Sequence, residues 1–188
     1  MDLPFISRDG SAVELLRKDH EEVKALFRDF ANAAQDSEKE RIVHEAIRAL
    51  DLHAAAEESV FYPAVRKDSP EAKDKLDESL EEHHIVKGLI AELREMSVGD
   101  ERYAAKFRVL AENVKHHIKE EEAELFARAR TGKLDLVELG KKLEKAKASF
   151  RPTSAPQSGG RRRNSHRTTA PSRSTSGRIR KPAKRVPR

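Results

Sequence analysis

Hydrophobic residues recur at spacings of three and four along most of the chain, a pattern that predicts amphipathic helices burying one face. No alternating run of β-branched residues indicates a strand. The pattern predicts an all-α protein, an up-down-up-down four-helix bundle with a short fifth helix packed on it. The expected helices cover roughly residues 11–34, 38–66, 70–96, 100–130 and 133–149.

Helix-capping residues place the starts of these helices. Ser11 and Ser37 each stand three residues before a glutamate, the arrangement of a capping box. Proline follows Ser69, at the first helical position, and Asp100 stands where the fourth helix should begin. Gly132 is expected to end that fourth helix.

Polar residues interrupt the buried face of each long helix at corresponding places. Each helix has a histidine there, and the second and fourth helices also have a glutamate four residues later. One residue turns a side chain by about 100°, so His84 and His116 should fall beside the buried face, and His44 should face water. The residues predicted to lie inside are His20, His53, Glu57, His83, His117 and Glu121.

The two halves of the bundle repeat one another. The histidines of the first and third helices are 63 residues apart, and those of the second and fourth are 64 apart. Such agreement predicts two related helical hairpins that pair about an approximate two-fold axis around a paired site. The matching segments are Asp19-His20-x-x-Val23-Lys24 with Glu82-His83-x-x-Val86-Lys87, and His53-x-x-x-Glu57-Glu58 with His117-x-x-x-Glu121-Glu122.

Four imidazoles and two carboxylates inside an apolar bundle need compensating positive charge, because an isolated buried carboxylate is very costly. Mixed imidazole and carboxylate ligation suits iron best, with manganese or zinc as alternatives. Two ions held by two histidines each and bridged by the glutamates would keep open positions for an oxo or hydroxo bridge and an outside ligand. The competing interpretation is a core of histidines ion-paired with glutamates and no metal.

Net charge divides the chain of 188 residues into two parts. Residues 151–188 contain 12 Lys and Arg and no Asp or Glu, so they carry +12, whereas residues 1–150 carry 26 minus 33, or −7. The basic part is rich in Ser, Thr, Pro, Gly and Arg, a composition typical of disorder. We expect a domain over residues 1–150 and a disordered tail over 151–188. The tail would bind nucleic acid without sequence specificity, and the alternatives are a solvating segment or contact with a membrane surface.

Several classes are excluded by composition. The absence of cysteine rules out disulfides, thiolate-bound zinc and iron–sulfur clusters. The N-terminus lacks the basic and apolar regions of a signal peptide, and there is no apolar run of about 18 residues. We therefore expect a cytoplasmic protein without a transmembrane segment.

Residues 10–130 resemble the hemerythrin family, specifically its bacterial His-His-Glu (HHE) cation-binding domain. The resemblance rests on Asp19-His20, His53-Ala-Ala-Ala-Glu57-Glu58-Ser-Val-Phe-Tyr-Pro63, Glu81-Glu82-His83-His84 and His117-Ile-Lys-Glu-Glu121-Glu122-x-x-Leu-Phe126. It implies metal-ligand roles for the six inward-facing residues and a centre of two iron ions. Glu58 and Tyr62 are candidates for hydrogen bonding around the metals, or else a solvated charge and a packing residue.

One departure from the oxygen-carrying members bears on function. Those proteins use five histidines, including a His-x-x-x-His pair on the third helix, and here Lys87 stands four residues after His83. The set of four histidines and two glutamates is instead similar to bacterial members linked to peroxide dismutation, repair of iron centres under nitrosative stress, and oxygen or nitric oxide response. Dismutation of H2O2 is the favoured expectation. A sensor or carrier of O2 or NO without turnover, and an iron protein tethered to nucleic acid by its tail, remain alternatives.

Overall fold

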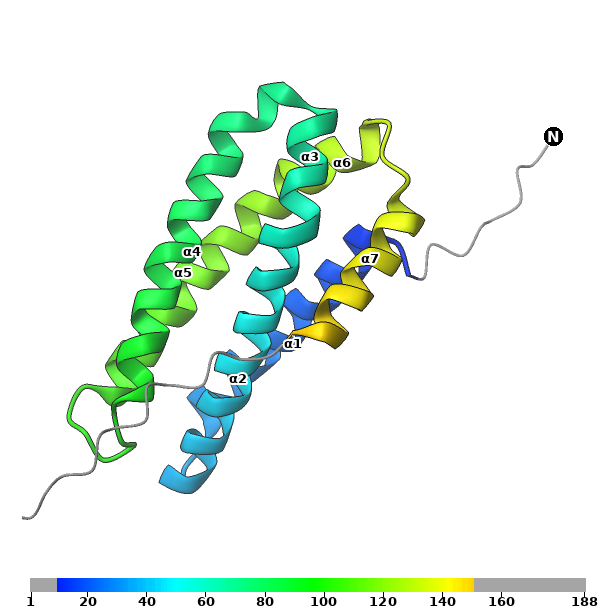
Figure 1. Ribbon diagram of the computed structural model, residues 1–188. Coiled ribbons are helices and arrows are strands. Elements are labelled where there is room, and N and C mark those ends of the chain that lie inside the picture. The colour runs from blue at the N-terminus through cyan, green and yellow to red at the C-terminus, as the bar shows by residue number, and fades with distance from the viewer. Residues whose placement is uncertain (1–9, 151–188) are drawn as a thin grey trace, which may run out of the picture. The chain divides into compact units, whose positions relative to one another are not determined.

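The computed structural model describes residues 10–150, and the secondary structure in this range is helical throughout (Figure 1). The elements in chain order are α1 (Ala12–Asn32), α2 (Asp36–Ala56), a π-helical turn (Glu57–Phe61), α3 (Tyr62–Asp68), a 3-10 turn (Pro70–Ala72), α4 (Lys73–Arg94), α5 (Tyr103–Ala123), α6 (Leu125–Thr131) and α7 (Leu136–Ser149). The predicted disordered tail and the boundary between residues 150 and 151 concern a part of the chain outside this range, so both stay predictions.

The helices form two hairpins that assemble into a bundle. α1 packs against α2, and α4 packs against α5, while α7 lies across α1, α2 and the π-helical turn (Figure 1). The predicted all-α four-helix bundle with a short fifth helix is confirmed. Within residues 10–150 we find no helix that combines the length and the apolar character needed to cross a membrane.

Three of the predicted helix boundaries are present. The side chain of Ser11 caps α1 by accepting a hydrogen bond from the backbone N–H of Glu14 at 3.4 Å. Ser69 precedes the 3-10 turn that leads into α4, with Pro70 as the first residue of that turn. Gly132 ends α6, the last segment of the fourth long helix.

Two boundaries were predicted wrongly. α2 begins at Asp36, so Ser37 lies inside its first turn and no side chain caps it. α5 begins only at Tyr103. The carboxylate of Asp100 instead accepts a hydrogen bond from the backbone N–H of Ser97 at 2.7 Å, and this local turn delays the helix start.

The second long helix is not regular, and the irregularity changes which residues are buried after Glu57. The backbone N–H of Tyr62 bonds the carbonyl of Glu57, a spacing of five residues that adds one residue to the turn. A regular α-helix would place Val60, three residues after Glu57, on the same buried face, but Val60 is only partly buried and Phe61 is fully buried. The π-helical turn therefore moves the apolar face by one residue directly beyond the candidate metal ligand.

The apolar core consists of two clusters, and the buried histidines and glutamates separate them along each long helix. One cluster lies beyond these polar residues toward the α1–α2 and α4–α5 connections and includes Phe27, Phe30 and Phe107. The other is built largely from α3, α6 and α7 and includes Phe61 and Phe126. The polar layer therefore lies between two apolar clusters.

α7 is held closely against the start of α1. Asp135 caps α7 by accepting hydrogen bonds from the backbone N–H groups of Val137 and Glu138. At Gly140 an added Cβ would collide with the backbone carbonyl of Gly10, so a glycine is needed for the close approach of the two segments. This docking brings the C-terminal end of α7 toward the polar layer.

Candidate metal centre

The structure brings all six predicted residues together in one buried layer. The residues at the six positions are at most 6% exposed, and the two glutamates are fully buried. By contrast, His44, His84 and His116 are exposed, as their positions beside the buried faces predicted. The six come from every long segment of the bundle: His20 from α1, His53 from α2, Glu57 from the π-helical turn, His83 from α4, and His117 and Glu121 from α5.

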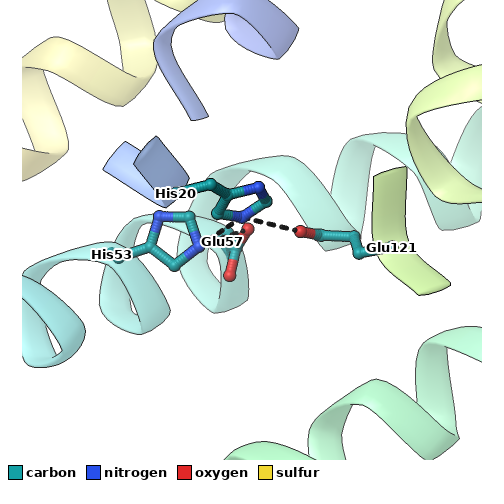
Figure 2. Close-up of side chains that lie close together, drawn as sticks. All are labelled: His20, His53, Glu57 and Glu121. Carbon is teal, nitrogen blue, oxygen red and sulfur yellow. Dashed lines mark hydrogen bonds and ion pairs between the residues drawn. The ribbon is translucent and has the colours of Figure 1, made fainter. Parts of the chain in front are cut away.

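These residues form two groups. Within each group, the nitrogen and oxygen atoms that could bind a metal lie within 4.8 Å of one another. The first group contains His20, His53, Glu57 and Glu121, which point toward one another in Figure 2. The second contains His83, His117 and again Glu57. Glu57 therefore belongs to both groups.

The two carboxylates take different positions. Glu57 faces both groups, because its Oε1 lies 3.0 Å from Nε2 of His53 and its Oε2 lies 3.4 Å from Nε2 of His83. Glu121 places Oε2 at 3.3 Å from Nε2 of His20. Glu57 thus presents one oxygen to each group.

The histidines meet in pairs through their Nε2 atoms. These atoms are 3.1 Å apart between His20 and His53, and 3.2 Å apart between His83 and His117. All four Nδ1 atoms lie within hydrogen-bond distance of an outer carboxylate, which favours a proton on Nδ1 and a lone pair on Nε2. Two such lone pairs facing each other repel, and a cation bound by both removes that repulsion.

The outer carboxylates follow a cyclic order around the bundle. Each of the four helices supplies a carboxylate to the histidine of the next helix. The Nδ1 to oxygen pairs are His53 with Asp19 at 3.0 Å, His83 with Glu58 at 2.8 Å, His117 with Glu82 at 2.7 Å and His20 with Glu122 at 2.9 Å. Every histidine is therefore oriented by a neighbour from another helix, which fixes the ring and keeps Nε2 directed inward.

The outer shell was only partly predicted from sequence. Glu58 was named as a candidate hydrogen-bonding residue, and it does lie against His83. Asp19, Glu82 and Glu122 were visible beside the ligands in the repeated segments but were given no role. The signal that could have found them is the acidic residue next to a ligand in all four segments.

The donor set fits a metal cation. All four oxygens of Glu57 and Glu121 are buried and make no hydrogen bond of regular geometry within residues 10–150, and their contacts with the Nε2 atoms of His20, His53 and His83 are ion pairs at 3.0 to 3.4 Å. Buried carboxylate oxygens without donors are strongly unfavourable unless a cation compensates them. Four inward-facing imidazole nitrogens beside them supply the remaining donors that iron, manganese or zinc takes.

Without a cation, protons take part of its place. Burial alone would lower the pKa of His53, but the charge of Glu57 and the hydrogen bond to Asp19 raise this pKa to about 10. Burial and repulsion from Glu57 raise the pKa of Glu121. Burial also acts to raise the pKa of Glu57, but the neighbouring histidines outweigh it and hold this pKa below its usual range. A metal ion would compete with these protons for the same atoms.

Aromatic rings cover the histidines on the side of the second apolar cluster. The ring of Phe126 stacks on His20 with 5.5 Å between centroids, and Tyr62 lies over His83 at 5.6 Å. The hydroxyl of Tyr62 lies 3.4 Å from Nε2 of His83. Burial and the carboxylates of Glu57 and Glu121 raise the pKa of Tyr62 well above its usual value, so it remains a neutral phenol.

A cavity of about 370 Å³ adjoins the histidines on the side of the other apolar cluster. All four buried histidines line it, together with aliphatic side chains from α1, α2, α4 and α5. Two ion pairs in its lining connect neighbouring segments to α4: Asp51 of α2 pairs with Arg94, and Glu58 of the π-helical turn pairs with Lys87. An outside molecule could therefore reach the inner nitrogen atoms from this side.

Helices that direct four histidines and two glutamates into one buried layer define a metal-binding helical bundle. The chain belongs to the hemerythrin family: residues 11–129 match the hemerythrin HHE cation-binding domain. This match covers the four long helices and includes all six candidate ligands.

Two known proteins are similar to this chain. A hemerythrin HHE cation-binding domain-containing protein from Mycobacterium kansasii has a crystal structure that covers 74% of this chain and 88% of its own, with a TM-score of 0.63 and 24% identity. At that identity the likeness shows the fold. A DNA nickase from Nostoc sp. is 28% identical over 123 residues, or 65% of this chain and 34% of the nickase, so this chain spans about a third of that relative.

Proposed function

We propose that this protein holds a non-haem di-iron centre that reacts with H2O2, O2 or NO in defence against oxidative or nitrosative stress, with dismutation of H2O2 as the favoured activity. The observation that carries the proposal is the cluster of buried Glu57 and Glu121 oxygens, without hydrogen bonds of regular geometry, and four inward-facing histidines beside a cavity. A closed structural metal site would have no reason for such a cavity.

The ligands in this proposal are His20, His53, Glu57, His83, His117 and Glu121. Each ion would take two histidines, and Glu57, whose two oxygens face different groups, would bridge the pair. Iron is favoured by its fit to imidazole and carboxylate donors, and manganese or zinc are the alternatives. Because each ion would have a small number of protein ligands, coordination positions would remain open for an oxo or hydroxo bridge and for an outside ligand.

Dismutation converts two H2O2 into two H2O and one O2, so one peroxide accepts two electrons and the other gives two. A pair of iron ions would supply and then recover these electrons by cycling between the ferrous and ferric states. The outer carboxylates of Asp19, Glu58, Glu82 and Glu122 hold the four imidazoles in place during this change. Aliphatic walls limit the water that reaches the reacting atoms.

Metal analysis together with an absorption spectrum of the purified protein tests the centre itself. We expect two irons per chain, one for each group of donors, and an absorption band from an oxo or hydroxo bridge. One zinc per chain, or no bound metal, would overturn the proposal.

Oxygen evolution after addition of H2O2 to the iron-loaded protein tests the activity. His53→Ala and Glu121→Ala should abolish it, because each removes an inward-facing donor. His44→Ala is the matched control, since His44 is an exposed histidine of the same helix as His53. Rapid bleaching without oxygen evolution would exclude dismutation. A stable adduct with O2 or NO in the same preparation would favour the sensor or carrier function.

A second candidate function is attachment of the metal centre to nucleic acid. It is supported by the +12 charge of residues 151–188 and by the similarity to a relative named as a DNA nickase. Binding through basic residues releases counterions, so affinity for DNA should fall steeply with salt. Truncation after Phe150 should remove the binding, and unchanged affinity would refute this function. The cytoplasmic location stays a prediction from the sequence.

A further inference from the structure

The cavity beside the histidines is larger than the small ligands considered above require. Its volume of about 370 Å³ corresponds to about a dozen water molecules at roughly 30 Å³ each. H2O2, O2 and NO each contain only two heavy atoms. The volume falls instead within the range of roughly 300–1,000 Å³ typical of pockets for organic ligands.

Apolar side chains from all four long helices line the cavity, together with the four histidines and four charged residues. Two faces are opposed: Val23 and Leu50 from the first hairpin, and Val86, Ile90 and Val114 from the second. These five side chains are at most 9% exposed. A compact apolar body would therefore replace water in contact with aliphatic groups on several sides.

The partly exposed side chains beside the cavity carry balanced charge. Lys87 donates to both oxygens of Glu58, at 2.6 and 2.7 Å, and Arg94 donates to Asp51. Two cations of α4 are thus paired with two anions of α2 and the π-helical turn, so these four side chains together leave no net charge to attract an ionic ligand. Among the described residues that line the cavity, the remaining polar side chains are those of the four histidines.

We propose that this cavity binds an uncharged organic molecule with a compact apolar body and one hydroxyl-type polar end directed at the histidines. The binding goes beyond the peroxide chemistry proposed above, because its determinants are the aliphatic walls and the paired charges, neither of which needs a metal. The Lys87–Glu58 pair has a positioning role here, since Glu58 also orients His83 through Nδ1. A bound molecule that displaces Lys87 would act directly on a residue that supports the metal centre.

The test uses the full-length, metal-free protein and the probe 2-phenyl-2-propanol, an unreactive alcohol with one aromatic ring. We expect saturable binding by calorimetry, with ligand-induced shifts in the methyl NMR signals of Val86, Ile90 and Val114. Benzoate and benzylamine, similar in size but charged, should bind at least about tenfold more weakly, a difference of about 1.4 kcal/mol. Tighter binding of either ion would overturn the assignment to uncharged ligands.

Two variants of adjacent residues on α4 locate the site. Val86→Phe should fill the cavity and weaken probe binding by at least about tenfold, while Ile85→Phe should not change it, since Ile85 is 54% exposed. Equal affinity in both variants would place binding elsewhere and refute the proposal. If Val86→Phe does not fold, Ala54→Leu adds bulk from the opposite wall at a half-buried position and serves the same purpose.

The outcomes separate this proposal from the proposed function. Oxygen evolution from H2O2 by the iron-loaded protein requires no organic molecule, and probe binding requires no iron. If the metal-free protein shows no saturable binding of the probe and only xenon or O2 enters the cavity, the cavity is a gas pocket and the inference is overturned. It would not alter the case for peroxide chemistry.

Discussion

The two halves of the metal centre have nearly the same donors but different neighbours. In one half the Nε2 atoms of His20 and His53 are 3.1 Å apart, and in the other those of His83 and His117 are 3.2 Å apart. Each of these histidines has a carboxylate on Nδ1. This likeness follows from the repeated hairpin in the sequence.

The neighbours break the symmetry. Phe126 stacks on His20, whereas its counterpart Tyr62 brings a hydroxyl toward His83. Asp19 also accepts a hydrogen bond from Lys147 of α7, a helix outside the repeat. The repeat therefore explains the similar donor sets, while residues around them make the two halves unequal.

The largest expected difference is between the two glutamates. Glu57→Ala should remove both ions, since Glu57 reaches both groups, and Glu121→Ala should mainly weaken the ion beside His20. The affinity loss for Glu57→Ala should exceed the roughly 100-fold cost of losing an outer partner. Metal content after dialysis measures both variants. Equal losses would show that the two carboxylates bridge equally.

The outer carboxylates should have smaller and similar effects in the two halves. Asp19→Asn and Glu82→Gln are expected to lower metal affinity by about 10–100-fold, because each loosens one histidine, His53 or His117. Lys147→Met is the control that tests α7, and it should reduce affinity less than Asp19→Asn. Competition with a chelator would measure all three, and no loss in either carboxylate variant would contradict the orienting role.

The metal-free and metal-loaded proteins should respond to pH in opposite directions. The raised pKa of His53, about 10 against 6.5, stabilises the metal-free fold fully below about pH 6.5, and this stabilisation is lost as the pH rises toward about 10. Metal binding requires unprotonated imidazoles, so the metal-loaded protein should gain stability as the pH rises through the lower part of the range from about 6.5 to 10. Urea unfolding at several pH values measures both. The same slope for the two forms would contradict a shared site for proton and metal.

The smallest expected effect concerns the hydroxyl that distinguishes the halves. Tyr62→Phe removes an oxygen 3.4 Å from His83 and makes that half resemble the one under Phe126. The free energy of unfolding should change by about 1 kcal/mol or less, because the bond is long. The metal-dependent absorption band should shift in Tyr62→Phe and stay unchanged in Tyr103→Phe, the control at the other tyrosine. A shift in both would show that the effect is not local.

Much of the fold and of the candidate site was predictable from sequence because helical phase is a local property. The spacing of apolar residues separated His83 from His84 and His117 from His116, and the structure buries the first of each pair. Helical periodicity does not identify the buried residue beyond Glu57, where the π-helical turn buries Phe61 in place of Val60. A bulge of one residue depends on packing against other helices, which periodicity does not describe.

By itself, the sequence determined that the protein is a helical bundle, that it repeats one hairpin, and that six polar side chains face the interior. Helical geometry and the equal offsets are enough for these conclusions. Only the tertiary structure decided which carboxylate orients which histidine, that Glu57 faces both groups, and that a cavity lies on one side of the layer. These features depend on distances between helices, which are set by packing rather than by spacing along the chain.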